Sequence, residues 1–174
     1  MKNVKSLITG ATTALFFIFA LSGIFQYVVI LLFGVDVNGF QLSINGLIPI
    51  FVCDENIGNY TFSFLLLLPV LSGILFIELS FFILSKLANG FVRYSTIVFL
   101  IIISGHLIVS VFYGLIKLIL FPSNLSIWEK LTGVWQLEEN QIYGFVFFII
   151  LVLFGYLQIM QKRLMQYLIV NKSN

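Results

Sequence analysis

Three polar side chains inside long apolar stretches of this chain could do chemistry: Glu78, His106 and Gln158. Polar and ionisable groups inside a membrane are costly, and they usually face a protein interior or a water-filled cavity on an ion or proton pathway. Glu78 lies eight residues before Lys86, and His106 lies twelve residues after Tyr94. At about 1.5 Å per residue, the depths of Glu78 and His106 differ by roughly 6 Å. We therefore treat the three residues as a candidate intramembrane polar site.

The sequence leaves two interpretations of Glu78 and His106 open. The pair could relay protons along a water-accessible path, or a neutral carboxyl and imidazole could hold two helices together. Gln158 is better suited to a hydrogen bond between helices than to chemistry.

Enzyme chemistry has little support in the residue types available. A helical zinc-protease motif needs two histidines four residues apart, whereas His106 is the only histidine and Cys53 the only cysteine. One histidine cannot supply the three protein ligands of a typical catalytic zinc site. Haem held between two histidines would require a second chain. We therefore expect no catalytic residues, no metal site and no cofactor.

Four apolar runs must position the polar residues, at approximately residues 7–34, 62–87, 95–121 and 142–161. A spanning helix needs about 20 mostly apolar residues to cross roughly 30 Å of hydrocarbon, and each run is long enough. The composition, 60% hydrophobic and 9% charged, lies far from that of soluble domains, in which about 25% of residues are charged. The sequence therefore predicts an all-α integral membrane protein, a bundle of four transmembrane helices forming one domain over residues 1–174.

Small residues occur as pairs in three of the four runs. Such residues let helix backbones approach closely, and serine can donate a hydrogen bond across the interface. Pro69 lies shortly before the second pair and predicts a kink there. The expected helix-packing residues are Ser22, Gly23, Ser72, Gly73, Ser104 and Gly105.

The basic residues predict the orientation in the membrane. Seven of the nine Lys and Arg residues lie at the two termini or between the second and third runs. Only Lys117 and Lys130 fall on the other side. The excess of basic residues marks the cytoplasmic side, so both termini are expected in the cytoplasm. Residues 162–174 are expected to form an amphipathic cytoplasmic tail.

The two outer loops carry local signals. Alternating apolar residues precede Asn45-Gly46, and an Asn-Gly pair between apolar segments predicts a small β-hairpin; the alternative is an apolar loop folded onto the helix ends. Ser126 and Glu129 match a capping box that would open a short helix. Trp128 and Trp135 are expected in the headgroup region.

The resulting functional hypothesis is a non-enzymatic accessory or assembly subunit in a lipid bilayer, binding another membrane protein or a copy of itself. The alternative is a small transporter or proton-coupled channel that uses Glu78 and His106. An intramembrane enzyme or haem carrier has the least support. The net charge of +2 gives no basis for nucleic-acid binding. A bacterial cytoplasmic membrane is the expected location.

Overall fold

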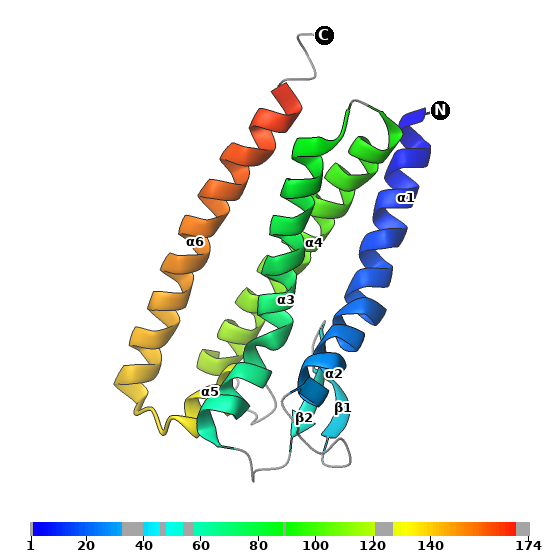
Figure 1. Ribbon diagram of the computed structural model, residues 1–174. Helices are drawn as coiled ribbons and strands as arrows, with labels where there is room; N and C mark the ends of the chain where they lie inside the picture. The colour runs from blue at the N-terminus through cyan, green and yellow to red at the C-terminus, as the bar shows by residue number, and fades with distance from the viewer. Residues whose placement is uncertain are drawn as a thin grey trace. The chain divides into compact units, whose positions relative to one another are not determined.

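The computed structural model describes residues 2–32, 40–45, 48–53, 58–88, 90–120 and 127–169. Two compact units divide the chain, Met1–Trp135 and Gln136–Asn174. The helices are α1 (Lys2–Phe16), the π-helix η1 (Phe17–Leu21), α2 (Ser22–Leu32), α3 (Asn59–Lys86), α4 (Phe91–Leu120), α5 (Ile127–Val134) and α6 (Glu139–Ile169). Two strands, β1 (Phe40–Asn45) and β2 (Ile48–Cys53), complete the fold (Figure 1).

Four helical segments of the described chain are long and apolar enough to cross a membrane: Val4–Leu32, Asn59–Lys86, Phe91–Leu120 and Glu139–Leu168. This confirms the four long apolar helices that the sequence predicts. Their bounds differ by a few residues from the apolar runs, because polar residues such as Asn59 and Lys86 also take helical conformation at the ends. The fourth helix continues without interruption to Ile169, and residues 170–174 lie outside the described part.

The first span packs on two different partners within the unit 1–135. Its first half, α1, runs along α4, whereas α2 lies against α3 and β2. The π-helical turn η1 separates the two halves. A π-turn carries one more residue per turn than an α-turn, so the residues after it face a different neighbour.

Small side chains allow the close approach of α1 to α4. Ser6, Gly10 and Ala14 are spaced four residues apart and are all buried, so they form one face of α1. A Cβ atom on Gly10 would lie 2.7 Å from the Cβ of Val98 and 2.5 Å from the carbonyl oxygen of Ser95. Any larger residue at position 10 would therefore separate the two helices.

The core of the unit 1–135 lies between α3 and α4. Its least exposed large side chains are Ile77, Leu84, Leu100, Ile103 and Leu115. On the other side of α3, a smaller cluster of Ile30, Leu65 and Leu68 joins α2 to α3. Figure 1 shows the N-terminus at the same end of this unit as the α3–α4 connection, with the strands and α5 at the opposite end.

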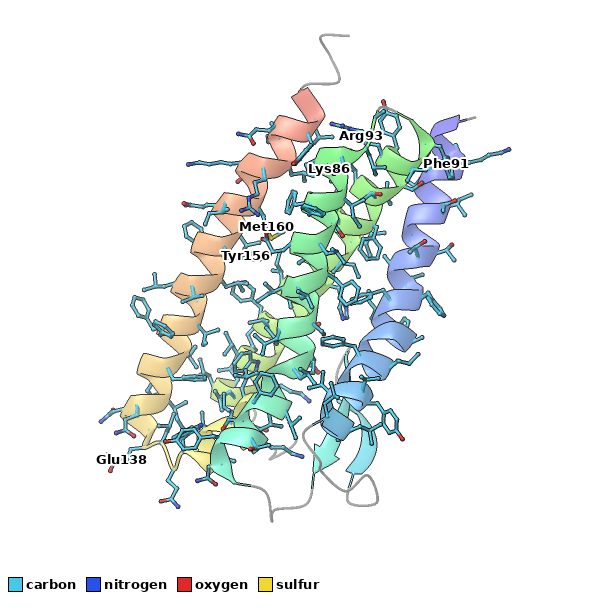
Figure 2. All side chains as sticks on the ribbon, viewed as in Figure 1. Lys86, Phe91, Arg93, Glu138, Tyr156 and Met160 are labelled. Atoms are coloured by element: carbon cyan, nitrogen blue, oxygen red, sulfur yellow. The ribbon has the colours of Figure 1, made fainter. Side chains whose placement is uncertain are left out.

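Arg93 ties the α3–α4 connection together. Its Nη1 donates a hydrogen bond to the Leu87 carbonyl oxygen at 3.0 Å, and the side chain is buried although it is charged. Lys86, Phe91 and Arg93 gather at this end of the unit (Figure 2). A basic residue near the last carbonyls of a helix interacts favourably with the helix dipole.

The helix α5 closes the opposite end of the unit. Its position confirms the short helix that the Ser126–Glu129 pattern predicts, although Ser126 lies outside the described residues. Trp128 is only 4% exposed and packs on Gly114 of α4, so it is a packing residue of this unit; its place in the headgroup region stays a prediction. Trp135 donates from Nε1 to Ser63 Oγ at 2.9 Å, and its ring lies 5.3 Å from that of Tyr60.

The strands β1 and β2 pair in antiparallel register, with Phe40 opposite Cys53 and Asn45 opposite Ile48. The Asn45-Gly46 pair predicts that residues 45 and 46 connect the two strands. In the observed register the connecting residues are 46 and 47, one position later. The two connecting residues lie outside the described part of the chain.

Candidate functional site

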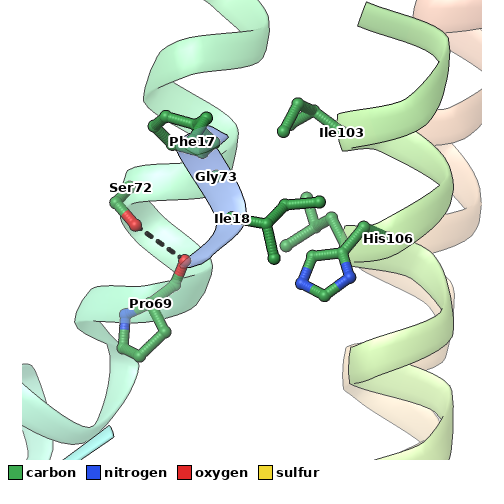
Figure 3. Close-up of a pocket in the computed structure, with 8 residues that line it drawn as sticks. Phe17, Ile18, Pro69, Ser72, Gly73, Ile103 and His106 are labelled. Carbon is green, nitrogen blue, oxygen red and sulfur yellow. Dashed lines mark hydrogen bonds between the residues drawn. The ribbon is translucent and has the colours of Figure 1, made fainter. Parts of the chain in front are cut away.

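A small cavity lies where η1, α3 and α4 meet. Among the residues that line it are Phe17 and Ile18 of η1, Pro69 and Ser72 of α3, and Ile103 and His106 of α4 (Figure 3). Its volume is about 20 Å³, and one water molecule needs roughly 10–15 Å³. The cavity therefore has room for a single water molecule, not for a file of them.

Two irregular helical segments create this space. The π-helical turn widens the first span at Phe17 and Ile18, and Pro69 lies inside α3. Proline lacks the backbone donor that would bond the carbonyl one turn earlier, and its ring pushes the preceding turn away. Because both irregularities occur at the same level of the unit, the helices cannot close completely on one another there.

Three phenylalanine rings flank the cavity. The Phe17 ring lies 4.3 Å from the Phe76 ring and 6.0 Å from the Phe99 ring, measured between centroids. Phe76 and Phe99 are both nearer than the cavity residues to the α3–α4 connection. The rings therefore form an apolar layer between the cavity and that end of the unit.

His106 is the ionisable residue of the cavity lining. It lies fifteen residues after Phe91 in a helix of 30 residues, at the middle of the span. Its ring points toward the α3 segment that carries Pro69 and Ser72 (Figure 3). Within the described part of the chain, neither ring nitrogen has a hydrogen-bond partner.

Ser72 is almost completely buried, with 1% of its surface exposed. Its hydroxyl donates to the Pro69 carbonyl oxygen at 2.9 Å, a bond within the same helix. The hydroxyls of Ser63, Ser80, Ser85 and Ser95 bond to their own helices in the same way. Local bonds of this kind satisfy serine without a partner helix, so the expected interhelical bond of Ser72 is not found.

His106 lines the cavity, whereas Glu78 is not among the residues that line it. Glu78 lies nine residues after Pro69 in α3, which corresponds to about two and a half helical turns. It therefore lies on the face opposite Pro69, and it does not line the cavity. The sequence analysis paired the two residues because their expected depths in the membrane are similar. Depth along a helix does not determine which face of the helix carries the side chain.

Gln158 belongs to the other unit. It lies on α6, and its side chain is exposed. Among the described residues 136–169, no second polar group bonds to the Gln158 side chain.

The three Ser-Gly pairs differ in their surroundings. Gly73 faces Leu107, because an added Cβ would lie 3.1 Å from the Leu107 Cδ1. Gly23 and Gly105 have open space around the Cβ position, with no atom within 4 Å. Ser104 is buried, and its hydroxyl has no hydrogen-bond partner among the described residues. The Ser22 side chain lies outside the described set.

Sequence reasoning missed two glycines at close contacts, Gly10 and Gly114. A Cβ on Gly114 would overlap the indole ring of Trp128. A usable signal was present, because Ser6 precedes Gly10 by four residues and Ser110 precedes Gly114 by four. Small residues four apart mark faces where membrane helices approach closely.

No group of three or more potential metal ligands occurs among the described residues. No protein-family model, no curated protein and no solved structure matches this chain. The four long apolar helices define its class as a multi-pass membrane protein.

Proposed function

We propose that this protein is a non-enzymatic subunit that binds another membrane protein through an uncovered face of α4. The observation that carries the proposal is the open space at Gly105. Ile101 and Val109, four residues to either side, are 49% and 53% exposed. The three residues share one helix face, so the chain leaves a shallow depression between two apolar side chains.

A depression of this kind suits a second helix in the membrane. Lipid tails are as apolar as leucine, so helices associate through close packing, and a glycine allows the partner backbone to approach. Gly23 offers the same geometry on α2, between Phe19 at 69% and Tyr27 at 40% exposure. The partner we propose is a transmembrane helix of another protein that presents small residues to Gly105.

The proposed arrangement in the membrane is a four-helix bundle with both termini and the α3–α4 connection in the cytoplasm. The distribution of Lys and Arg supports this orientation. It would place the β1–β2 hairpin and α5 on the outer side. The composition of the chain is the basis for proposing a bacterial cytoplasmic membrane.

Proton-coupled transport through Glu78 and His106 has less support. A relay needs the two groups on one hydrated path, whereas Glu78 lies on the opposite face of α3 from the cavity that His106 lines. Transport stays the second candidate function, and only on a path that uses His106 without Glu78.

The replacement of Gly105 by leucine tests the proposal. Gly105→Leu should keep the thermal stability of the purified protein, because the position has open space, and it should abolish co-purification of the partner. Gly73→Leu is the matched control on α3. It should lower the free energy of unfolding by about 1–3 kcal/mol through overpacking against Leu107. Unchanged partner recovery with Gly105→Leu would overturn the proposed interface.

A further inference from the structure

We infer that the α3–α4 connection binds the headgroup of an anionic phospholipid, held by the Lys86 ammonium group beside the buried charge of Arg93. The inference goes beyond the proposed partner face, because Gly105 lies in the middle of α4 whereas Lys86 is the last residue of α3. It does not depend on which side of the membrane this end of the unit 1–135 faces.

The connection places two cationic side chains at the same end of α3 (Figure 2). Arg93, the third residue of α4, donates from Nη1 to the carbonyl oxygen of Leu87 at 3.0 Å, and Leu87 directly follows Lys86. This bond fixes the buried guanidinium group at the end of α3. Lys86 is exposed, so it is the cation that a ligand can reach.

The charge at this end of the unit is positive. Besides Lys86 and Arg93, the first turns of α1 carry two further lysines at the same end (Figure 1). Of the two acidic residues described in the unit, Glu78 lies eight residues before Lys86, about 12 Å along the helix axis, and Glu129 lies on α5 at the opposite end. Groups of Lys and Arg at a membrane surface attract anionic headgroups. A zwitterionic headgroup would bring a positive charge of its own toward these cations.

The direction of the Lys86 side chain favours a lipid over a free anion. Side chains of a helix tilt toward its N-terminus, and Lys86 Nζ lies 5.8 Å from the centre of the Phe82 ring, one turn earlier in α3. The Phe82 side chain is 62% exposed. A lysine whose aliphatic part follows apolar surface carries its ammonium group to the boundary between hydrocarbon and water. A phospholipid matches both groups, with a phosphate for Lys86 and an acyl chain for Phe82.

Equilibrium binding of radiolabelled phospholipids to the full-length protein in detergent tests the inference. The wild type should bind phosphatidylglycerol at least about fivefold more tightly than phosphatidylcholine. Lys86→Gln should weaken the binding of phosphatidylglycerol by about fivefold, because each cation near an anionic headgroup contributes a factor of that size. Lys86→Arg keeps the charge and should bind phosphatidylglycerol as the wild type does.

Lys117→Gln is the matched control. Lys117 follows Tyr113 by four residues, as Lys86 follows Phe82, and its Nζ lies 5.3 Å from the centre of the Tyr113 ring. It belongs to the last turn of α4, at the opposite end of the unit, so its replacement should leave the binding unchanged.

Three results would overturn the inference. The first is equal affinity of the wild type for the two phospholipids. The second is a folded Lys86→Gln variant that binds phosphatidylglycerol as tightly as Lys117→Gln does. The third is displacement of the bound lipid by an equal concentration of inorganic phosphate, which would assign the site to a free anion.

Discussion

At the scale of single residues, glycine decides where the helices of the unit 1–135 touch. Gly10, Gly73 and Gly114 meet neighbouring helices, whereas Gly23 and Gly105 do not. The Ser-Gly pairs identified only Gly73 among the close contacts. A pair of small residues specifies a position along a helix but not its face, and faces differ by about 100° from one residue to the next.

Gly114 offers the sharpest test of this packing. Gly114→Ala places a methyl group in the indole ring of Trp128, a rigid side chain that is 4% exposed. We expect the free energy of unfolding to fall by about 1–3 kcal/mol, measured by thermal or denaturant unfolding in detergent.

Gly133→Ala is the control for the change in helix propensity. Gly133 lies on α5 and has open space around it, so alanine there should be neutral or stabilising by up to about 1 kcal/mol. Equal stability of the two variants would show that Trp128 does not pack on Gly114.

At the scale of elements, hydrophobicity alone predicts the four spans, because length and composition are sufficient to identify a membrane helix. The π-helix η1 was not predicted. Its sequence, Phe17-Ile-Phe-Ala-Leu21, contains no proline or glycine to indicate an irregular turn. The turn is associated with tertiary packing, since α1 packs along α4 whereas α2 packs against α3. The cavity beside His106 was therefore unpredictable as well.

The orientation of the elements can be tested by cysteine labelling. In a Cys53→Ser background, cysteines at Lys5 and Gly90 should be protected from a membrane-impermeant reagent in intact cells. Cysteines at Gly58 and Glu138 should be labelled. The physical reason is the excess of Lys and Arg at the termini and beside the α3–α4 connection. Labelling at Gly90 from outside would contradict the proposed topology.

At the scale of the whole molecule, each of the two units, taken by itself, leaves apolar helix faces uncovered. Exposed apolar side chains are expected wherever a helix meets lipid, so exposure alone does not identify a partner. The face of α4 differs from the others because Gly105, between Ile101 and Val109, has open space at its Cβ position. The sequence predicted Gly105 as a packing residue, and it could not indicate whether the packed helix belongs to this chain or to another.

Site-specific photo-crosslinking in native membranes tests this claim most directly. A benzophenone amino acid would replace Val109 on the proposed face or Leu75 on α3, two positions of nearly equal exposure at 53% and 52%. We expect a discrete protein adduct at Val109, with a mass other than twice that of the chain, and lipid adducts alone at Leu75. Lipid adducts alone at Val109, or an adduct of two copies of this chain, would contradict the proposed role as an accessory subunit.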